Sequence, residues 1–324
     1  MLLTVVPSLM AGVVSARIAW QDLPPMPVGA AGGASALIGG TKLIYAGGTT
    51  WVDGSKRWLR DVRQYDLAGR SWNDGPSLPE ALAYGGWVAG SDGVEIFGGM
   101  SGSGPSKNCW RLDPGLKEWT RTSDLPQSAV LGRVEGVRGV AYLFGGCSDV
   151  NAPMHCSEDV WMREASGKWT RVSRMPDGPV AVQAGAVEDG HIYLFGGCFE
   201  VPGGVVNRDD AYRYDPATRE WQKLRSLPVA GRGISAANIG GGRILLAGGY
   251  TASAHDAASF GPEYGFSQKV WIYHTGEDRY ESATPLPFGV SGIEIAIHEG
   301  TIVALGGEDR MRGRSRRCIQ GKVE

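Results

Sequence analysis

Apolar segments that end in a Gly-Gly pair recur six times along the chain. The pairs are about 50 residues apart, and they end at Gly48, Gly99, Gly146, Gly197, Gly249 and Gly307. After each of the first five pairs come a loop, a segment rich in aromatic residues and a further aromatic side chain. A Leu-Pro or Met-Pro turn and a segment rich in Gly and Ala then lead to the next pair. Short apolar runs bounded by Gly and Pro indicate β-strands, so each repeat predicts four short strands.

The further aromatic residue of each repeat stands at a fixed place before the proline turn. These residues are Trp72, Trp119, Trp169, Trp221 and Tyr280. A large flat side chain at a repeated position packs well between neighbouring sheets, so we expect these residues to form core between repeats. The glycines have a local reason too, because a strand must end there in a sharp turn close to neighbouring backbone.

This order of Gly-Gly, aromatic residue and Leu-Pro resembles the kelch repeat family, and the resemblance covers residues 17–324. It implies an all-β fold, a six-bladed β-propeller of four-stranded blades around a central channel, in one domain. The segment around Trp20 looks like an outer strand without its three partners, whereas the sixth repeat stops before any Trp. We therefore expect the N-terminal segment to supply the fourth strand of the blade made by residues 288–321, which removes an open sheet edge.

Composition agrees with a β-rich domain and excludes several classes of protein. Gly accounts for 50 of 324 residues without a G-X-Y period, which argues against an all-α fold and against collagen. The formal net charge of -2 gives no sign of a nucleic-acid partner. No apolar run of about 20 residues follows the N-terminal segment, so we expect no membrane span.

Residues 1–16 form an apolar run that ends in Val14-Ser15-Ala16, a sequence that suits cleavage by signal peptidase. No Lys or Arg precedes the run, and the alternative interpretations are a disordered tail or an extra strand. We expect a signal peptide, and a mature bacterial protein that is periplasmic or secreted. In such an oxidising compartment a disulfide between Cys147 and Cys156 is expected.

The loops after the Gly-Gly pairs and after the Leu-Pro turns are expected on one face, because consecutive strands of a blade run antiparallel. Functional side chains gather at such a loop-rich end. Candidates there include Trp51, Tyr250 and Arg232, the only Arg shortly after a Leu-Pro turn. The longest loop, residues 250–268, contains Tyr264 and is predicted to form a lid or rim over the channel; a disordered insertion is the alternative.

The sixth repeat is the richest in charge. Glu308 and Asp309 follow its Gly-Gly pair directly, and five arginines come next: Arg310, Arg312, Arg314, Arg316 and Arg317. An exposed strand with one solvated face would explain the alternation of arginines. The other interpretation is that one or two guanidinium groups bind an anionic ligand, beside a carboxylate that can move a proton.

The stretch from Gly248 to Ile319 shows a closer resemblance. Its long loop, its Leu-Pro with Gly-Val, and its Gly-Gly-Glu with a downstream Arg-Ser are similar to the bacterial N-acetylneuraminate epimerases, or sialic acid mutarotases. That family consists of six-bladed periplasmic propellers that interconvert the anomers of free sialic acid. The resemblance implies that Glu308 and Arg314 are the active-site pair. In the family the matching turn lies in a middle blade and a second Gly-Gly-Glu follows, whereas this chain has one, at 306–308.

Other chemistries of propellers fit poorly. A galactose oxidase needs a copper site with Tyr and His ligands, and the five His of this chain are not placed to converge on the channel mouth. Cys147, His155 and Cys156 make only a weak metal motif. We expect neither a metal nor a cofactor.

Two functions remain. The first is a cofactor-independent mutarotase for sialic acid or a related acidic sugar, in which Glu308 moves the proton. The residues expected to hold the sugar are Arg232, Arg312 and Arg314 for its carboxylate, and Trp51, Tyr250 and Tyr264 for its ring. The second is a non-catalytic propeller that binds a protein or glycan partner through its loop-rich face.

Overall fold

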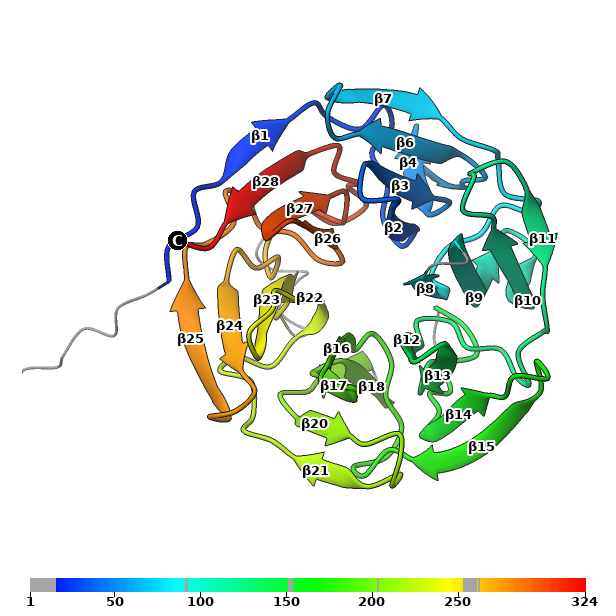
Figure 1. Cartoon of the computed structure of the whole chain (residues 1–324), viewed down its shortest axis with the longest axis vertical. Coiled ribbons are helices and arrows are strands. Elements are labelled where there is room, and N and C mark those ends of the chain that lie inside the picture. The colour runs from blue at the N-terminus through cyan, green and yellow to red at the C-terminus, as the bar shows by residue number, and fades with distance from the viewer. Residues whose placement is uncertain (1–15, 91–92, 151–153, 203, 253–260, 262) are drawn as a thin grey trace, which may run out of the picture.

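The structure, a computed structural model, describes residues 16–324 apart from 91–92, 151–153, 203, 253–260 and 262. It is a ring of six four-stranded antiparallel sheets around a central channel (Figure 1). No helix occurs among these described residues. The expected all-β, six-bladed propeller is therefore confirmed. Residues 1–15 lie outside the described part of the chain, so the signal peptide stays a prediction.

Each blade places its first strand at the channel and its last strand at the outer edge (Figure 1). Blade 1 contains β2 (Ala34–Ile38), β3 (Lys42–Ala46), β6 (Val62–Asp66) and β7 (Ser71–Asp74); blade 2 contains β8 (Gly86–Gly90), β9 (Gly93–Ser101), β10 (Gly104–Leu112) and β11 (Trp119–Arg121); blade 3 contains β12 (Arg133–Val137), β13 (Val140–Phe144), β14 (Asp159–Arg163) and β15 (Trp169–Arg174). Blade 4 contains β16 (Ala184–Glu188), β17 (His191–Phe195), β20 (Ala211–Tyr214) and β21 (Trp221–Lys223); blade 5 contains β22 (Arg232–Asn238), β23 (Arg243–Tyr250), β24 (Val270–His274) and β25 (Arg279–Ala283); blade 6 contains β26 (Glu294–His298), β27 (Thr301–Leu305), β28 (Cys318–Lys322) and β1 (Gln21–Leu23).

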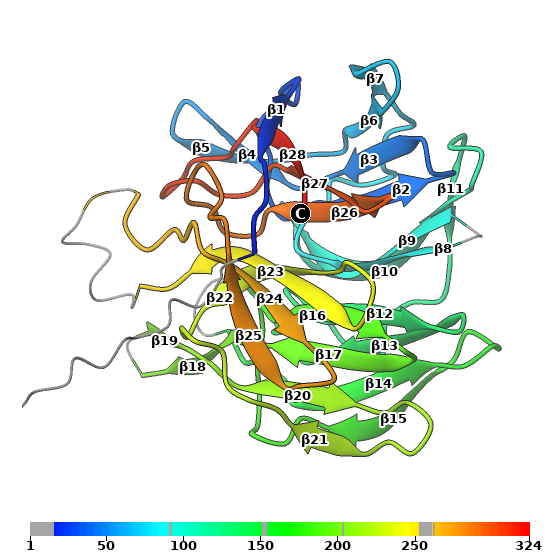
Figure 2. The ribbon, with the colours of Figure 1, turned by 60° about the vertical axis from the view of Figure 1, so that its left-hand side comes forward.

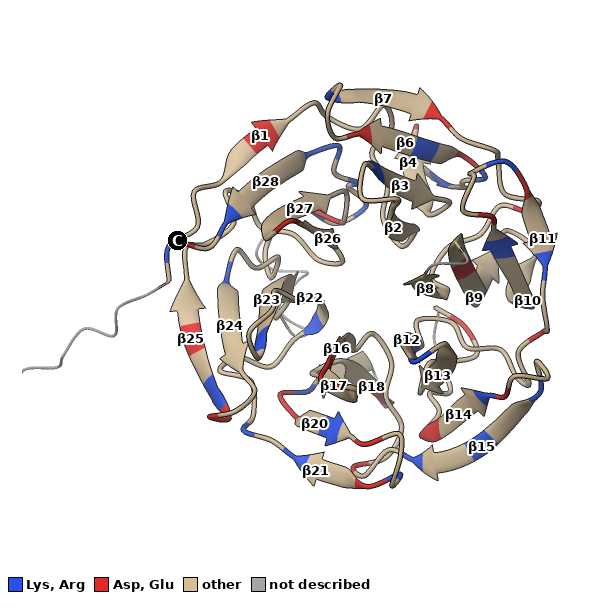
Figure 3. Cartoon of the chain, viewed as in Figure 1, with Lys and Arg blue, Asp and Glu red and all other residues tan. Residues whose placement is uncertain are grey.

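Two short hairpins extend from the ring. They are β4 (Thr49–Val52) with β5 (Ser55–Trp58), and β18 (Cys198–Val201) with β19 (Gly204–Asn207). Each follows a Gly-Gly pair, and both project from the same face of the propeller (Figure 2). Charged residues lie mainly on the outer strands and the loops, so the few that occur on inner strands stand out (Figure 3).

The N-terminal segment closes blade 6, as the sequence predicts. Strand β1 pairs antiparallel with β28, with Asp22 opposite Ile319. Trp20, just before β1, packs into the core between blades 5 and 6. Its indole Nε1 donates to the carbonyl of Thr284 at 3.2 Å. The last blade therefore contains strands from both ends of the sequence. Strand β1 covers the outer edge of β28 and completes the four-stranded sheet.

Aromatic residues of the outer strands tie most blades to the preceding one. The bonds run from Trp72 to the Pro24 carbonyl, from Trp119 to the Pro76 carbonyl, from Trp221 to the Ser173 hydroxyl and from Tyr280 to the Arg225 carbonyl, at 2.8 to 3.0 Å. With the bond of Trp20, the same device serves five of the six junctions. The predicted packing of these residues between blades is thus accompanied by a directed hydrogen bond.

The junction between blades 2 and 3 is built differently. The indole nitrogen of Trp169 is buried and has no hydrogen-bond partner among the described residues. Instead, Arg163 of β14 reaches back to blade 2, where its Nη2 donates to the buried carboxylate of Glu95 at 2.8 Å. The same guanidinium lies over the rings of Phe97 and Trp169. An ion pair therefore holds this junction in place of the aromatic hydrogen bond.

Both glycines of every Gly-Gly pair have positive φ, the left-handed region that favours glycine. The final pair illustrates the close approach as well. A Cβ on Gly307, whose φ is 88°, would lie 2.9 Å from the carbonyl oxygen of Ser291. These turns carry the chain from each second strand to the mouth of the channel.

Candidate functional site

The residue after each Gly-Gly pair lies at the rim of the channel, beside the segment that leads into an inner strand. These residues are Thr49, Met100, Cys147, Cys198, Tyr250 and Glu308, and they pair with Ala31, Ala83, Val130, Ala181, Arg232 and Ser291, respectively. The loops after Gly-Gly and after Leu-Pro therefore share one face, as the antiparallel order requires. Glu308 is the only charged residue of the first set, and Arg232 is the only one of the second.

A ring of backbone hydrogen bonds frames the channel one residue further on. The amides of Tyr84, Leu131, Val182, Gly233 and Gly292 donate to the carbonyls of Gly32, Tyr84, Leu131, Val182 and Gly233, respectively, at 2.7 to 3.2 Å. All six residues have φ between 58° and 71°. Blades 2 to 4 carry side chains at this position, whereas blades 5, 6 and 1 carry glycine. The mouth is therefore narrowed on one side and open on the side where Glu308 and Arg232 lie.

Glu308 and Arg314, predicted together from the sequence, form an ion pair at this open side. Nη2 of Arg314 lies 2.8 Å from Oε1 of Glu308. Nε of Arg314 donates to the Thr49 hydroxyl at 3.1 Å, Nη1 to the Gly313 carbonyl at 2.8 Å, and Nη2 also to the Tyr84 hydroxyl at 3.4 Å. The Arg314 side chain is only 5% exposed, whereas the Glu308 side chain is 35% exposed. Each guanidinium nitrogen thus donates to a protein group, and the carboxylate faces solvent at the channel mouth.

The other arginines of this segment have separate partners. Residues 310–317 form a loop, since β28 begins at Cys318, and the interpretation as an exposed alternating strand does not describe it. Arg312 lies over the Trp51 ring at 5.5 Å, and Arg317 lies over the Phe288 ring at 4.6 Å. Arg316 donates to the carbonyl of Met26 at 2.7 Å. Among the described residues, Arg314 is the arginine of this segment that pairs with Glu308.

Arg232 and Tyr250, both predicted to bind substrate, contact each other. The Arg232 guanidinium lies 4.6 Å from the centre of the Tyr250 ring, and its Nη1 donates to Asn207 Oδ1 at 2.6 Å. Tyr250 is buried, meets Phe266 edge-on, and has a pKa raised by burial. One face of the Tyr250 ring is therefore covered by protein and not offered to a ligand.

Trp51 and Tyr264 complete the predicted set. Trp51 is half-buried on β4 with Arg312 over its ring. Tyr264 is 39% exposed, near Tyr250. Residues 253–260 and 262 of the predicted lid lie outside the described residues, so the lid stays a prediction.

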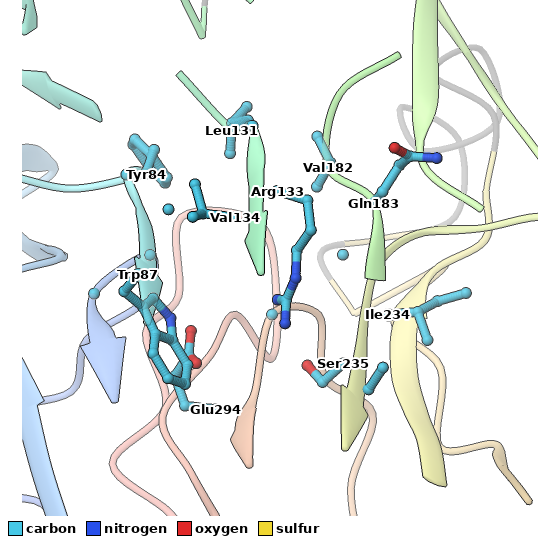
Figure 4. Close-up of a pocket in the computed structure, with 18 of the residues that line it drawn as sticks. Tyr84, Trp87, Leu131, Arg133, Val134, Val182, Gln183, Ile234, Ser235 and Glu294 are labelled. Carbon is cyan, nitrogen blue, oxygen red and sulfur yellow. The ribbon is translucent and has the colours of Figure 1, made fainter. Parts of the chain in front are cut away.

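A second arginine and a second glutamate lie deeper in the channel, where the sequence analysis named no residue. Two residues beyond the backbone ring, the six blades carry Ala34, Gly86, Arg133, Ala184, Ser235 and Glu294. Blades 3 and 6 stand opposite each other across the ring (Figure 1), so Arg133 and Glu294 face one another at the same depth. They line a pocket of about 170 Å³ together with Trp87 and Gln183 (Figure 4).

Arg133 and Glu294 differ in how many hydrogen-bond partners they have within the protein. Nε of Arg133 donates to Glu135 at 2.6 Å and Nη2 to the Gly185 carbonyl at 2.8 Å, whereas Nη1 has no bond to any described residue. The Glu294 carboxyl has no hydrogen bond within the described part of the chain, and burial raises its pKa to about 8 although Arg133 opposes the shift. Superposing the six repeats on their rim residues would have revealed this pair, because the other four blades have Ala, Gly or Ser there.

Clustered metal-ligating side chains and membrane-spanning helices are absent from the described part of the chain. No group of three or more His, Cys, Asp or Glu side chains suited to hold a metal occurs in the described ranges. Among the same residues, no helix is long and apolar enough to cross a membrane. Cys147 and Cys156 are free thiols joined by a hydrogen bond, so the disulfide remains a prediction.

Comparison with known proteins agrees with the fold. Residues 185–228 match the family model of the Kelch motif. The chain contains a kelch motif. The expected resemblance to kelch propellers, stated from the Gly-Gly spacing, is thereby confirmed for a segment that includes most of blade 4.

Several curated proteins that resemble part of this chain carry the same name. An N-acetylneuraminate epimerase of Yersinia enterocolitica is 26% identical over 189 residues, which cover 50% of this chain and 48% of the relative. One of Haemophilus influenzae is 27% identical over 186 residues, covering 50% of each chain. N-acetylneuraminate epimerase 1 of Escherichia coli O6:H1 is 23% identical over 185 residues, covering 49% of this chain and 50% of the relative. The chain thus spans about half the length of the curated relatives it matches, and the resemblance to epimerases of this name is confirmed.

Proposed function

We propose that this kelch propeller is a mutarotase that interconverts the anomers of a free acidic sugar, N-acetylneuraminic acid or a close analogue. The observation that carries the proposal is the Glu308–Arg314 ion pair, which stands at the open side of the channel mouth. It occupies the one rim position among six that bears a carboxylate. The relatives named N-acetylneuraminate epimerase support the choice of sugar.

The chemistry needs only proton transfer. A base takes the proton of the anomeric hydroxyl while the bond between the anomeric carbon and the ring oxygen breaks, and an acid protonates that oxygen. Ring closure on the other face of the carbonyl gives the second anomer. Glu308 is placed for the proton at the anomeric hydroxyl, because its carboxylate is accessible and is held by a buried guanidinium. No redox step or cofactor enters this sequence. We also propose that the protein works in the periplasm or outside the cell, as a signal peptide at residues 1–16 would direct.

The test is proton NMR on the protein with freshly dissolved β-N-acetylneuraminic acid. We expect the α anomer to appear faster than in buffer, and Glu308→Gln to reduce the enzymatic rate by about 100-fold. Glu220→Gln, an exposed carboxylate between β20 and β21, is the matched control. An unchanged rate in Glu308→Gln would refute the role of Glu308. Binding of the sugar without acceleration would instead favour the non-catalytic propeller, which the kelch fold also accommodates.

A further inference from the structure

We propose that Glu294 is the second proton-transfer residue of this reaction and that Arg133, opposite it in the channel, binds the substrate carboxylate. This inference rests on the proposed function, because it assigns the acid that must act together with Glu308. It adds a catalytic residue from blade 6 and a specificity-determining residue from blade 3, neither of which the sequence analysis named. The arguments are the register of blade 6, the open donor of Arg133 and the residues that line the pocket.

Register places Glu294 and Glu308 close together in blade 6, three residues apart along the second strand and its extension. Ser291 pairs with Glu308 at the rim, and Glu294 pairs with Leu305 three residues earlier on the second strand. At about 3.3 Å per residue, the two backbone positions are about 10 Å apart or less along the strand. Each side chain extends part of that distance, so a pyranose ring between them can touch both carboxyl groups.

Arg133 is the guanidinium with capacity for a ligand. Every nitrogen of Arg314 already donates to protein, which suits positioning of Glu308 rather than capture of an anion. Nη1 of Arg133 has two N–H donors and no bond to the described residues, and its side chain extends into the pocket (Figure 4). A carboxylate bound there would gain a charge-assisted hydrogen bond.

The chemistry of the sugar matches three converging groups. In N-acetylneuraminic acid, a single carbon carries the anomeric hydroxyl, the carboxylate and the ring oxygen. Such a carbon would be approached from three directions: by Glu308 at the mouth, by Glu294 deeper on blade 6, and by Arg133 on the opposite blade 3. Ala34, Gly86 and Ala184 at the same depth leave room for the ring.

The proton transfers of the cycle balance without a co-reactant. Glu308 takes the hydroxyl proton, the carbonyl forms as the ring C–O bond breaks, and protonated Glu294 gives its proton to the ring oxygen. After rotation about the bond to the carbonyl carbon, Glu294 takes that proton back, the oxygen attacks the other face, and Glu308 returns its proton to the carbonyl oxygen. Both carboxyl groups end in their starting states.

Glu294 is suited to begin this cycle protonated. The charged or titratable groups that face it are Arg133, which is paired with Glu135, and Tyr45. Burial raises the pKa of Tyr45 above its usual value, so this hydroxyl is neutral. The adjacent inner strands β2 and β22 present Ala34 and Ser235 at this depth, and neither is charged. Since the pKa of Glu294 is raised to about 8, the carboxyl holds its proton at neutral pH.

The experiment measures anomer exchange by NMR across pH, with the uncatalysed rate subtracted, for N-acetylneuraminic acid and its methyl ester. We expect the wild-type rate to fall above about pH 8, and Glu294→Gln to lose about 100-fold in kcat together with that limb of the profile. We expect Arg133→Lys to raise KM for the acid by about tenfold and to leave KM for the ester unchanged. Controls are Glu299→Gln and Arg138→Lys, exposed residues of the same two blades at the opposite end of the channel. Urea unfolding confirms that each variant is folded.

Several outcomes separate this inference from the proposed function. Full activity and an unchanged pH profile in Glu294→Gln, with Glu308→Gln inactive, overturn the role of Glu294 and leave the mutarotase standing. Equal effects of Arg133→Lys on acid and ester overturn the carboxylate assignment. If the wild-type protein accelerates nothing, the proton-transfer role falls with the proposed function. Weaker binding of the ester than of the acid, a difference lost in Arg133→Lys, would still support the carboxylate site.

Discussion

Replacing Glu95 by Gln tests whether an ion pair holds blades 2 and 3 together. The Glu95 side chain is 5% exposed, and its carboxylate accepts hydrogen bonds from Arg163, from Arg111 at 2.9 Å and from the Thr122 hydroxyl at 2.5 Å. Gln keeps the shape but removes the charge. Arg163, whose side chain is 13% exposed, would then carry an uncompensated charge between two blades.

The expected cost is about 3 kcal/mol of unfolding free energy, the lower end of the range for breaking a buried pair. The lower end applies because Arg111 is 38% exposed and can be hydrated without its partner. Burial alone would raise the pKa of Glu95, but hydrogen bonds from Arg163, Thr122 and Arg111 outweigh it and lower the pKa below 4.5. A lowered pKa in the folded state contributes stability above the unfolded value and loses it as pH falls. The difference between wild type and variant should therefore be complete at neutral pH and shrink below pH 4.5.

The assay is urea unfolding followed by tryptophan fluorescence, at neutral pH and below pH 4.5. Glu118→Gln, an exposed carboxylate in the same blade, is the control and should change stability by less than about 0.5 kcal/mol. A Glu95→Gln variant as stable as this control would refute the reasoning. So would a loss of stability that is independent of pH, because it would then arise from packing and not from charge.

Three further perturbations test other features. Trp20→Phe removes the hydrogen bond to Thr284 and should lower the unfolding free energy by about 1 kcal/mol; an unchanged urea midpoint would contradict this. The hydrogen bond with Cys147 lowers the pKa of Cys156 and favours its reactive thiolate, so oxidised glutathione should protect both thiols from alkylation as a reducible disulfide; two thiols that stay reactive would contradict it. Gly307→Ala places a side chain at φ 88° and should destabilise the protein by more than 1 kcal/mol, and near-wild-type urea stability would show that the turn can relax.

The repeat predicted the fold because its signals are local and strong. Both glycines of each pair adopt a backbone conformation that other residues reach only with strain, so their spacing marks where strands end. The aromatic before each proline marks the outer strand, and its absence from the sixth repeat correctly assigned Trp20 to that blade. The different construction at Trp169 escaped prediction, because its partner Arg163 contacts a residue on another blade.

The candidate site was predictable only in part. Glu308 and Arg314 lie close in sequence beside a recognisable turn, and the structure brings them into contact. Arg133 and Glu294 are far apart in sequence and look like ordinary strand residues. Their juxtaposition depends on how far around the ring their blades lie, which becomes visible only when the six repeats are placed in register.

Closure of blade 6 also determines how late in folding the channel mouth with Glu308 and Arg314 can form. Gln21 and Gln320, which meet across β1 and β28, are 299 positions apart in sequence. Whether the chain emerges from a ribosome or from an export channel, β1 must therefore stay unpaired, and open to wrong pairing, until nearly all of the propeller has emerged. Glu308 and Arg314 lie in the segment that leads into β28. The pair should thus be among the last parts of the molecule to reach its final geometry, so a chain stalled before β28 would present folded blades without an assembled channel mouth.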